Sequence, residues 1–359
     1  MKKLNANYEA RLYKRLSGNK VRCSLCPRRC VIDDGSTGRC RVRMNEKGKL
    51  YAISYGRAVH VAEEFIETEA VFHFEPGSRI LSVGNVGCNL SCVYCQNWRF
   101  SQLDHINEND IFEYTPEQIV RMALEKGIKV ISWTYNDPAI WLEFVEDTAK
   151  LARRHGIYNL FKSALFLTPE AIEAFMDVID IFSISVKSLD PDFYRRFTGG
   201  WIKPVIEGTQ QIFKGQRHHM EISNLIVTDA NDNEKDYMDL INWVKAHLSV
   251  DVPIHFVRFH PNYKYTHVSR PTIETLERAR ELAKASGIRH CYLGNVFMHE
   301  GANTYCSVCN SLLVERRGLN AEPIGLESGK EEYICRRCKN RTQIKMFHTE
   351  ESFYESIEV

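Results

Sequence analysis

The chain has 359 residues, a formal net charge of +1 and 44% hydrophobic residues, which is typical of a soluble globular protein with about two folding units. The sequence contains no run of about eighteen apolar residues and no apolar signal core at the N-terminus, so we expect a cytoplasmic protein without a membrane partner. Residues 1–50 carry 14 Lys and Arg against four Asp and Glu. Aromatic residues are not interleaved with these basic residues, so nucleic-acid binding is not expected.

The cysteines are the most informative residue type. In a cytosolic chain, twelve cysteines indicate metal ligands or catalytic thiols rather than disulfides. Only Cys291 stands alone, within an apolar run that is typical of a core position. The other eleven form three groups: Cys23, Cys26, Cys30 and Cys40; Cys88, Cys92 and Cys95; Cys306, Cys309, Cys335 and Cys338.

The N-terminal segment is predicted to form a separate extension over residues 1–74. Leucine and tyrosine residues at a spacing of four predict a helix over about residues 5–17. The four cysteines that follow lie among Gly and Pro residues with little apolar surface, so a metal would have to supply folding free energy. Zinc and an auxiliary iron–sulfur cluster both fit this group. Alternating residues after position 50 predict short strands.

The central cysteine group has C-x3-C-x2-C spacing and directly follows the apolar run of residues 80–84. A [4Fe-4S] cluster takes four ligands, so three thiolates leave one iron open to an external ligand. This spacing is typical of the radical S-adenosylmethionine (SAM) superfamily, in which SAM chelates the open iron. The reduced cluster then releases methionine and a 5′-deoxyadenosyl radical that abstracts hydrogen. A zinc site is the alternative, but zinc sites usually add a second, distant cysteine pair.

Residues 75–299 alternate between apolar runs and amphipathic stretches. Helices are predicted to begin after Thr115, at Pro138 and after Thr272, where capping residues or proline precede an apolar period. This order predicts an α/β fold, a partial (β/α)6-type radical SAM barrel whose chemistry lies at the carboxyl ends of the strands. The predicted strands are the apolar runs 80–84, 128–133, 157–161, 180–186, 219–227, 253–259 and 288–293.

Residues 300–359 are predicted to form a third domain. Two C-x2-C pairs about 25 residues apart flank a strand-like segment at residues 312–316. Four thiolates in this arrangement predict a tetrahedral zinc-ribbon or rubredoxin-like module, in which iron is the alternative to structural zinc.

The chain as a whole resembles the radical SAM enzyme family of the AmmeMemoRadiSam system, a relative of the pyruvate formate-lyase activating enzymes. The resemblance extends almost from end to end. It rests on the residues of the cluster loop, continued by Gln96-Asn97-Trp98, and on the segments 23–30, 72–77, 133–138, 258–261, 292–295 and 303–306.

The resemblance implies several cofactor contacts. Cys88, Cys92 and Cys95 would hold the [4Fe-4S] cluster, and Tyr94 would lie beside the adenine of SAM. Asn136 would meet the amino group of SAM, and Lys187 its carboxylate; a lysine at the end of a buried strand needs such an anion. The remaining candidates for cofactor binding are Asn97, Thr134, Tyr135, Ser163, Ser185, Asn224, Arg258 and His260.

Two positions depart from the family pattern. Ser185 stands where relatives have an Asp before the Lys, and Ser163-Ala164-Leu165 stands where they have Thr-Asn-Gly. These changes suggest a SAM pose or a substrate that differs from those of the activating enzymes.

The sequence therefore predicts a radical SAM enzyme that abstracts hydrogen from an unidentified small molecule, peptide or protein; it identifies no catalytic residue. A low-potential donor such as ferredoxin or flavodoxin is implied. The narrower alternative is a glycyl-radical-enzyme activase. A different class of protein, an iron–sulfur electron relay or a nucleic-acid-binding zinc-ribbon protein, is the other alternative.

Overall fold

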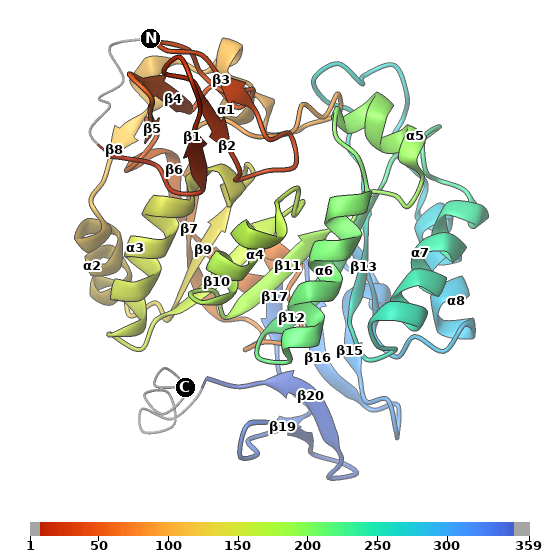
Figure 1. Cartoon of the computed structure of the whole chain (residues 1–359). Helices are drawn as coiled ribbons and strands as arrows, with labels where there is room; N and C mark the ends of the chain where they lie inside the picture. The colour runs from red at the N-terminus through yellow and green to blue at the C-terminus, as the bar shows by residue number, and fades with distance from the viewer. Residues whose placement is uncertain (1–7, 348–359) are drawn as a thin grey trace. The chain divides into compact units, whose positions relative to one another are not determined.

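The computed structural model describes residues 8–347 and divides into two compact units. The first unit comprises residues 1–63, 81–182 and 194–218, and the second comprises 64–80, 183–193 and 219–359. Three of the five boundaries between these ranges fall within strands β6, β7 and β11; the other two follow α5 and precede β12. The units group residues differently from the three domains predicted above, and that three-part division stays a prediction. Figure 1 labels the elements of both units.

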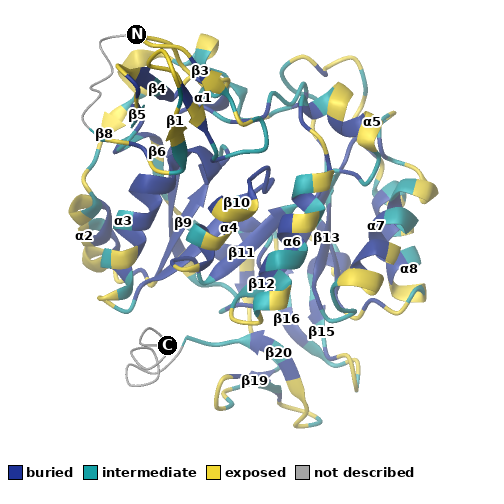
Figure 2. Cartoon of the chain, viewed as in Figure 1, coloured by how far each residue is buried: buried dark blue, intermediate teal, exposed yellow. Residues whose placement is uncertain are grey.

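Parallel strands form the centre of the first unit. Strand β7 pairs with β9, and β9 with β10, in the register Leu81↔Ile131 and Ile131↔Asn159. Apolar runs form these strands because both faces of a parallel sheet are covered, and Figure 2 colours them as buried. The strand order is β10-β9-β7-β6-β8. The bounds are β6 Arg57–Phe65, β7 Arg79–Asn85, β8 Phe112–Glu113, β9 Val130–Thr134 and β10 Tyr158–Ser163.

Two helix starts were predicted in the first unit: α2 begins after Thr115 as predicted, and the helical segment predicted from Pro138 begins as a short 3₁₀ helix that leads into α3. Thr115 accepts from the backbone N–H of Gln118, whose side chain accepts from the Thr115 N–H, a complete capping box. Helices α2 and α3 lie side by side, as do α4 and α6 (Figure 1). The bounds are α1 Trp98–Ser101, α2 Pro116–Glu125, α3 Leu142–Arg153, α4 Pro169–Met176 and α6 Lys203–Gly215; a short 3₁₀ helix, Pro138–Trp141, leads into α3.

The helix predicted over residues 5–17 is wrong within the described part of the chain; residues 5–7 lie outside it. Tyr13–Arg15 forms strand β1, which pairs antiparallel with β2, so that Tyr13 faces Cys23. Leu12 adopts a left-handed conformation with φ +54°, which interrupts any helix. The pairing of β1 with β2 stabilises a strand here, although the spacing of four between apolar residues predicted a helix. The remaining short strands are β2 Val21–Cys23, β3 Val31–Ile32, β4 Arg43–Glu46 and β5 Lys49–Ala52.

The second unit contains the remaining parallel strands in the order β14-β13-β12-β11. Helices α7 and α8 pack against each other, and α8 also contacts β13 and β14. A strand overlaps each of the four apolar runs predicted at 180–186, 219–227, 253–259 and 288–293. The bounds are β11 Ile181–Ser185, β12 His219–Ile226, β13 Ile254–Arg258, β14 Cys291–Gly294, α5 Pro191–Phe193, α7 Glu234–His247 and α8 Ile273–Ala285.

The C-terminal residues of the second unit form two three-stranded sheets. Seven buried residues make up the core of this region, and two of them are cysteines, Cys306 and Cys335. No helix within residues 8–347 is long and apolar enough to cross a membrane. The bounds are β15 Thr304–Tyr305, β16 Leu312–Arg317, β17 Asn320–Glu322, β18 Leu326–Glu327, β19 Glu332–Cys335 and β20 Arg341–Lys345.

One segment that carried the family resemblance, residues 72–77, attaches this C-terminal region to the rest of the second unit. The backbone N–H of Lys345 donates to the His73 carbonyl at 2.8 Å, and the N–H of Glu75 donates back to the Lys345 carbonyl at 3.0 Å. The Tyr333 hydroxyl donates to the Glu75 carboxylate at 3.1 Å. The motif therefore has a structural function.

Candidate functional site

The central cysteine group lies at the carboxyl end of β7, in the loop that leads to α1. Cys88, Cys92 and Cys95 are all half-buried. Burial raises the pKa of Cys88 well above its ordinary value, and the charges of Asp137, Cys92 and Cys95 raise it further. A bound metal centre would reverse this effect, because it holds its cysteine ligands as thiolates.

Backbone and side-chain hydrogen bonds fix the conformation of this loop. The N–H of Ser91 donates to the Thr198 carbonyl at 2.9 Å, and Nδ2 of Asn89 donates to the Phe166 carbonyl at 2.8 Å. Gly199 has φ +68°, and a Cβ there would lie 2.5 Å from the Ser91 hydroxyl. The loop is therefore held in shape by segments that follow β10 and β11 in the chain.

Two asparagines connect the ends of β7 and β9. Nδ2 of Asn136 donates to the carbonyls of Asn85 and Phe100, the latter at 3.1 Å, and Nδ2 of Asn85 donates to the Gly87 carbonyl at 3.3 Å. The Oδ1 atoms of both asparagines are buried and accept no hydrogen bond within residues 8–347. A buried acceptor without a donor is costly, and an ammonium or amide donor from a ligand would satisfy it.

Asp137 forms a hydrogen-bonded turn beside these asparagines. Its carboxylate accepts from the Ser163 hydroxyl at 2.6 Å and from the backbone N–H groups of Ala164 at 3.1 Å and Ala139 at 3.2 Å. The Ser163 hydroxyl also accepts from the Leu165 N–H at 2.8 Å. Ser163 was predicted to contact the cofactor, and in the structure its hydroxyl positions Asp137.

The other predicted cofactor-binding residues of the first unit surround the same loop. Tyr94 is buried, which raises the pKa of its phenol well above the ordinary value. Nδ2 of Asn97 donates to the Tyr135 carbonyl, and Thr134 is the buried last residue of β9. Tyr135 has φ +65°, and a Cβ on Gly84 would lie 2.9 Å from its ring. Glycine at position 84 thus makes room for this tyrosine.

Three predicted residues lie together in the second unit, near the ends of β11 and β12. The hydroxyls of Ser185 and Ser223 are 3.1 Å apart. Nδ2 of Asn224 donates to the Lys187 carbonyl at 3.1 Å, and Nδ2 of Asn231 donates to the same carbonyl at 2.7 Å. Asn224 therefore fixes the backbone that carries Lys187, a positioning function that the sequence did not indicate.

The last two predicted residues follow β13. Nε of Arg258 donates to the Pro271 carbonyl at 2.7 Å. His260 is exposed, with Nδ1 lying 3.1 Å from the Pro261 carbonyl. Their assignment as cofactor ligands stays a prediction.

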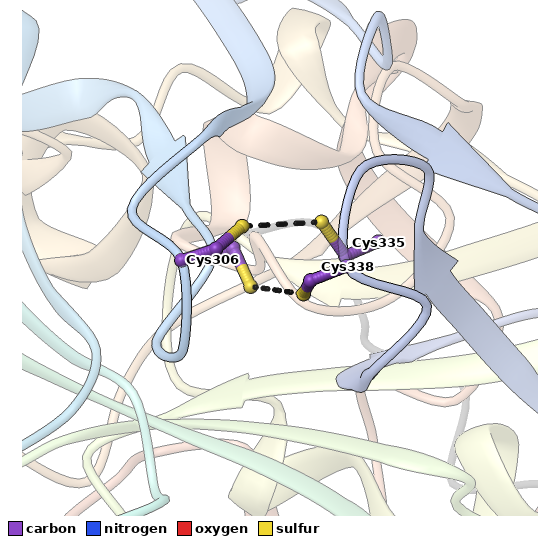
Figure 3. Close-up of side chains that lie close together, drawn as sticks. Cys306, Cys335 and Cys338 are labelled. Atoms are coloured by element: carbon purple, nitrogen blue, oxygen red, sulfur yellow. Dashed lines mark hydrogen bonds between the residues drawn. The ribbon is translucent and has the colours of Figure 1, made fainter.

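The C-terminal cysteines form a compact four-sulfur group, shown in Figure 3. All four sulfurs lie within 4.8 Å of one another; Sγ of Cys306 is 3.6 Å from Cys338, and Sγ of Cys309 is 3.7 Å from Cys335. Zinc–sulfur bonds of 2.3 Å in a tetrahedron place the sulfurs about 3.8 Å apart, so this group fits a single metal ion. Burial raises the pKa of Cys335, but the Ser311 hydroxyl and backbone N–H groups lower it to about 6.

The N-terminal cysteines lie near one another but are spaced more widely. Burial raises the pKa of Cys26 to about 12, and the charges of Cys40, Cys23 and Cys30 add to this increase. Within residues 8–347, the only group of three or more Cys, His or carboxylate ligands within 4.8 Å is the C-terminal one. No three of the N-terminal sulfurs therefore lie within 4.8 Å of one another.

Sequence reasoning missed Asn85, Asp137, Asn231 and Arg28. Asn85 is the last residue of β7 and Asp137 comes three residues after the end of β9, so both are polar residues near the carboxyl end of an apolar strand, and this signal was available. Arg28 donates through Nε to the Asn89 carbonyl at 3.2 Å, and Asn231 donates to the Lys187 carbonyl. Both contacts are to segments that are distant in the sequence, so no local pattern indicates them.

Three features indicate the class of protein: the cysteine loop, the parallel α/β units and the compact four-sulfur group. A family model described as the radical SAM superfamily matches residues 83–244, and the chain is an enzyme of that superfamily. It is 40% identical over 336 residues to uncharacterized protein MJ0808 of Methanocaldococcus jannaschii, covering 94% of this chain and 99% of the relative. The finer resemblance to the AmmeMemoRadiSam-system family stays a prediction.

Two further similarities are more distant. A probable GTP 3′,8-cyclase of Methanosarcina mazei is 25% identical over 249 residues, covering 64% of this chain and 72% of the relative. A solved domain of pyruvate-formate lyase-activating enzyme from Bacteroides vulgatus is 17% identical, covers 46% of this chain and 98% of its own, and has a TM-score of 0.41.

Membership of the superfamily implies a [4Fe-4S] cluster, SAM and a source of electrons. The first unit fits these cofactors. Cys88, Cys92 and Cys95 would supply the thiolates that such a cluster requires, and the buried Oδ1 of Asn136 is an acceptor without a donor within residues 8–347.

Proposed function

We propose that the chain reductively cleaves SAM and abstracts hydrogen from a substrate that is not yet identified. The observation that carries this proposal is the loop of Cys88, Cys92 and Cys95 at the carboxyl end of β7, where parallel α/β folds place their chemistry. When bound, the cluster supplies one low-potential electron to the sulfonium of SAM, which yields methionine and the hydrogen-abstracting deoxyadenosyl group.

The residues of the first unit bind and orient the cofactors. Asn136 accepts a hydrogen bond from the amino group of SAM through Oδ1, while its Nδ2 keeps the side chain in place. Tyr94 would lie beside the adenine, and the backbone around Thr134 and Tyr135 would shape the adjoining wall. Asn97 holds that wall to the cluster loop by its bond to the Tyr135 carbonyl.

The source of the electron is a one-electron protein donor of low potential, of the ferredoxin or flavodoxin type. A sulfonium is difficult to reduce, so the cluster that reduces it must have a low reduction potential. A donor with a high potential could not reduce such a cluster. A glycyl-radical activase is the narrower version of this proposal; the serine at position 163, engaged with Asp137, departs from the activating-enzyme pattern.

An anaerobic turnover assay tests the proposal. The reconstituted protein is mixed with SAM and dithionite, and 5′-deoxyadenosine is measured by mass spectrometry. Cys92→Ala is the blank, and Cys291→Ala, which changes a buried cysteine outside the three groups, is the matched control. Wild type and Cys291→Ala should form deoxyadenosine, whereas Cys92→Ala should not. An intact cluster that ignores SAM and yields no product would instead favour the electron-relay protein.

We also propose that the C-terminal group binds structural zinc. Its sulfur spacing is that of a tetrahedral ion, and its apolar core is too small to be stable alone. Metal analysis of the purified chain should find one zinc that Cys335→Ala removes and Cys291→Ala retains. One iron per chain in its place, with the visible spectrum of an iron–tetrathiolate site, would overturn the assignment to zinc.

A further inference from the structure

We propose that Cys23, Cys26, Cys30 and Cys40 hold an auxiliary iron–sulfur cluster, which lies next to the loop of Cys88, Cys92 and Cys95 and exchanges electrons with its cluster. All seven cysteines belong to the first unit. The proposal rests on three observations: the spacing of the sulfurs, a buried guanidinium beside them, and direct contacts between the two cysteine segments.

The spacing of the sulfurs distinguishes this group from the C-terminal one. The C-terminal sulfurs lie within 4.8 Å of one another, as four ligands of one ion must, and the N-terminal sulfurs do not meet this criterion. A polynuclear cluster places several iron atoms between its cysteines, so its sulfurs are farther apart than those around a single ion. The wider group therefore fits a cluster better than zinc.

Arg43 is a buried cation beside these thiols. Its side chain is 1% exposed; Nη2 donates to Glu143 at 2.7 Å and to the Arg11 carbonyl at 2.6 Å. The Nε and Nη1 groups are buried and have no acceptor within residues 8–347. Glu143, Cys23 and Cys40 all lie close enough to Arg43 to interact with its charge.

The Arg43–Glu143 pair is matched in charge, but Nε and Nη1 of Arg43 and Oε2 of Glu143 are buried without a hydrogen-bond partner in the described part of the chain, so the arginine has donors left for an acceptor that a ligand would bring. A buried arginine is strongly unfavourable unless its charge and its donors are matched, and Glu143 supplies one charge and one acceptor atom. Four thiolates around iron carry net negative charge and offer sulfur acceptors. A cluster on Cys23 and Cys40 would therefore satisfy the part of Arg43 that the protein leaves unmatched.

Direct contacts join the two cysteine segments. The Cys40 carbonyl lies 3.5 Å from the position of a Cβ on Gly87, the residue before Cys88. Nε of Arg28, between Cys26 and Cys30 in the chain, donates to the Asn89 carbonyl at 3.2 Å. The N-terminal segment is thus hydrogen-bonded to the residue after Cys88, and its Cys40 carbonyl lies near the residue before Cys88.

This contact provides a route for electrons. One electron passes from an external one-electron reductant to the auxiliary cluster and then to the cluster at Cys88, Cys92 and Cys95; no proton moves and no covalent bond changes. The relay rests on the proposed function of that second cluster. The proposal that the N-terminal cysteines bind iron does not depend on that function.

The first experiment measures the iron at this site without the SAM cluster. In a triple variant, Cys88→Ala with Cys92→Ala and Cys95→Ala, the anaerobically reconstituted chain should retain about four iron and four sulfide. After dithionite reduction, the addition of SAM should not change its EPR spectrum. Adding Cys26→Ala and Cys40→Ala should remove this iron, whereas adding Cys291→Ala should not. A triple variant that carries zinc and no iron at these cysteines would overturn the proposal.

A measurement on the otherwise intact chain covers the case in which the triple variant fails to fold. Cys26→Ala alone should lose about half of the wild-type iron and keep the SAM-sensitive EPR signal. If Cys26→Ala retains the full iron content, the N-terminal group holds no cluster.

The second experiment tests the proximity of the clusters. In the dithionite-reduced wild type, magnetic interaction should broaden the EPR spectrum relative to the sum of the spectra of the triple variant and Cys26→Ala. A spectrum equal to that sum would overturn the relay. Neither readout requires SAM turnover, so a chain that makes no deoxyadenosine but contains both interacting clusters would refute the proposed function alone.

Discussion

Arg28 is bonded to Asn89: its Nε donates to the asparagine carbonyl at 3.2 Å, and its Nη2 donates to the Gly199 carbonyl at 2.6 Å. The arginine thereby ties the N-terminal cysteine segment to the residue that follows Cys88. The same guanidinium lies over the rings of Phe166 and Trp201, at 5.4 and 5.7 Å from their centroids. The conformation of the cluster loop therefore depends on a residue about sixty positions earlier.

Replacing Arg28 should impair SAM cleavage. Arg28→Ala removes two hydrogen bonds from a charged donor, each worth about 1.5–3 kcal/mol, and part of this loss should loosen the cluster loop. We expect deoxyadenosine formation to fall roughly tenfold, which corresponds to about 1.4 kcal/mol in the activation barrier. The control is Arg29→Ala, since Arg29 is exposed and pairs with Glu170. Equal rates for the two variants would show that the loop does not depend on Arg28.

Gly84→Ala should weaken SAM binding. The added Cβ would lie 2.9 Å from Cδ2 of Tyr135, so the ring must move, and Tyr135 belongs to the proposed wall of the cofactor site. We expect roughly tenfold weaker binding of SAM, about 1.4 kcal/mol, in an EPR titration of the reconstituted cluster. Gly215→Ala is the control because its Cβ would meet only the flexible end of Met176. An unchanged titration for Gly84→Ala would place Tyr135 outside the SAM site.

His218 should make the stability of the protein depend on pH. Burial lowers the pKa of His218 to about 4, and the neighbouring Arg217 contributes to this decrease. The pKa of histidine in the unfolded chain is about 6.5. Between about pH 4 and pH 6.5, His218 therefore binds a proton in the unfolded chain but not in the folded chain. Stability is therefore complete above about pH 6.5 and decreases as the pH falls from there toward 4.

The His218→Gln variant tests this dependence. Between pH 7 and pH 5, the free energy of unfolding of the wild type should decrease by about 1 kcal/mol more than that of the variant, a value reduced for the partial exposure of the histidine. Chemical denaturation at both pH values measures the difference. His155→Gln, which changes an exposed histidine, should behave like the wild type. Parallel pH profiles for His218→Gln and the wild type would contradict the prediction.

Arg316 should be essential for the stability of the second unit. It is fully buried; Nη1 donates to the Thr304 hydroxyl at 2.7 Å, Nε lies 3.4 Å from Glu67, and Cζ lies 3.8 Å from the centre of the Phe72 ring. Arg316→Ala leaves the Glu67 carboxylate buried without its cationic partner, so we expect a loss of about 3–5 kcal/mol in denaturation experiments. Arg317→Ala, at an exposed position, should change stability by less than about 0.5 kcal/mol.

Much of the fold could be predicted from the sequence. The segments that form β7, β9 and β10 are covered on both faces, so their sequences are nearly continuous apolar runs. Runs of this length and composition predict strands without further information. The helix starts at Thr115 and Thr272 were predictable because a capping side chain acts within three residues. The predicted helix at residues 5–17 failed because β1 exists only through its pairing with β2.

The chemistry of the cysteines was determined by the sequence, since thiols at C-x3-C-x2-C or paired C-x2-C spacing can reach a metal centre from a short loop whatever the distant packing is. Tertiary structure decided how those groups are used. It brought Arg43 to Cys23 and Cys40, joined Arg28 to Asn89, and left Oδ1 of Asn136 without a donor. These relationships connect residues that are far apart in the chain, and no local spacing encodes a contact that only the closed fold creates.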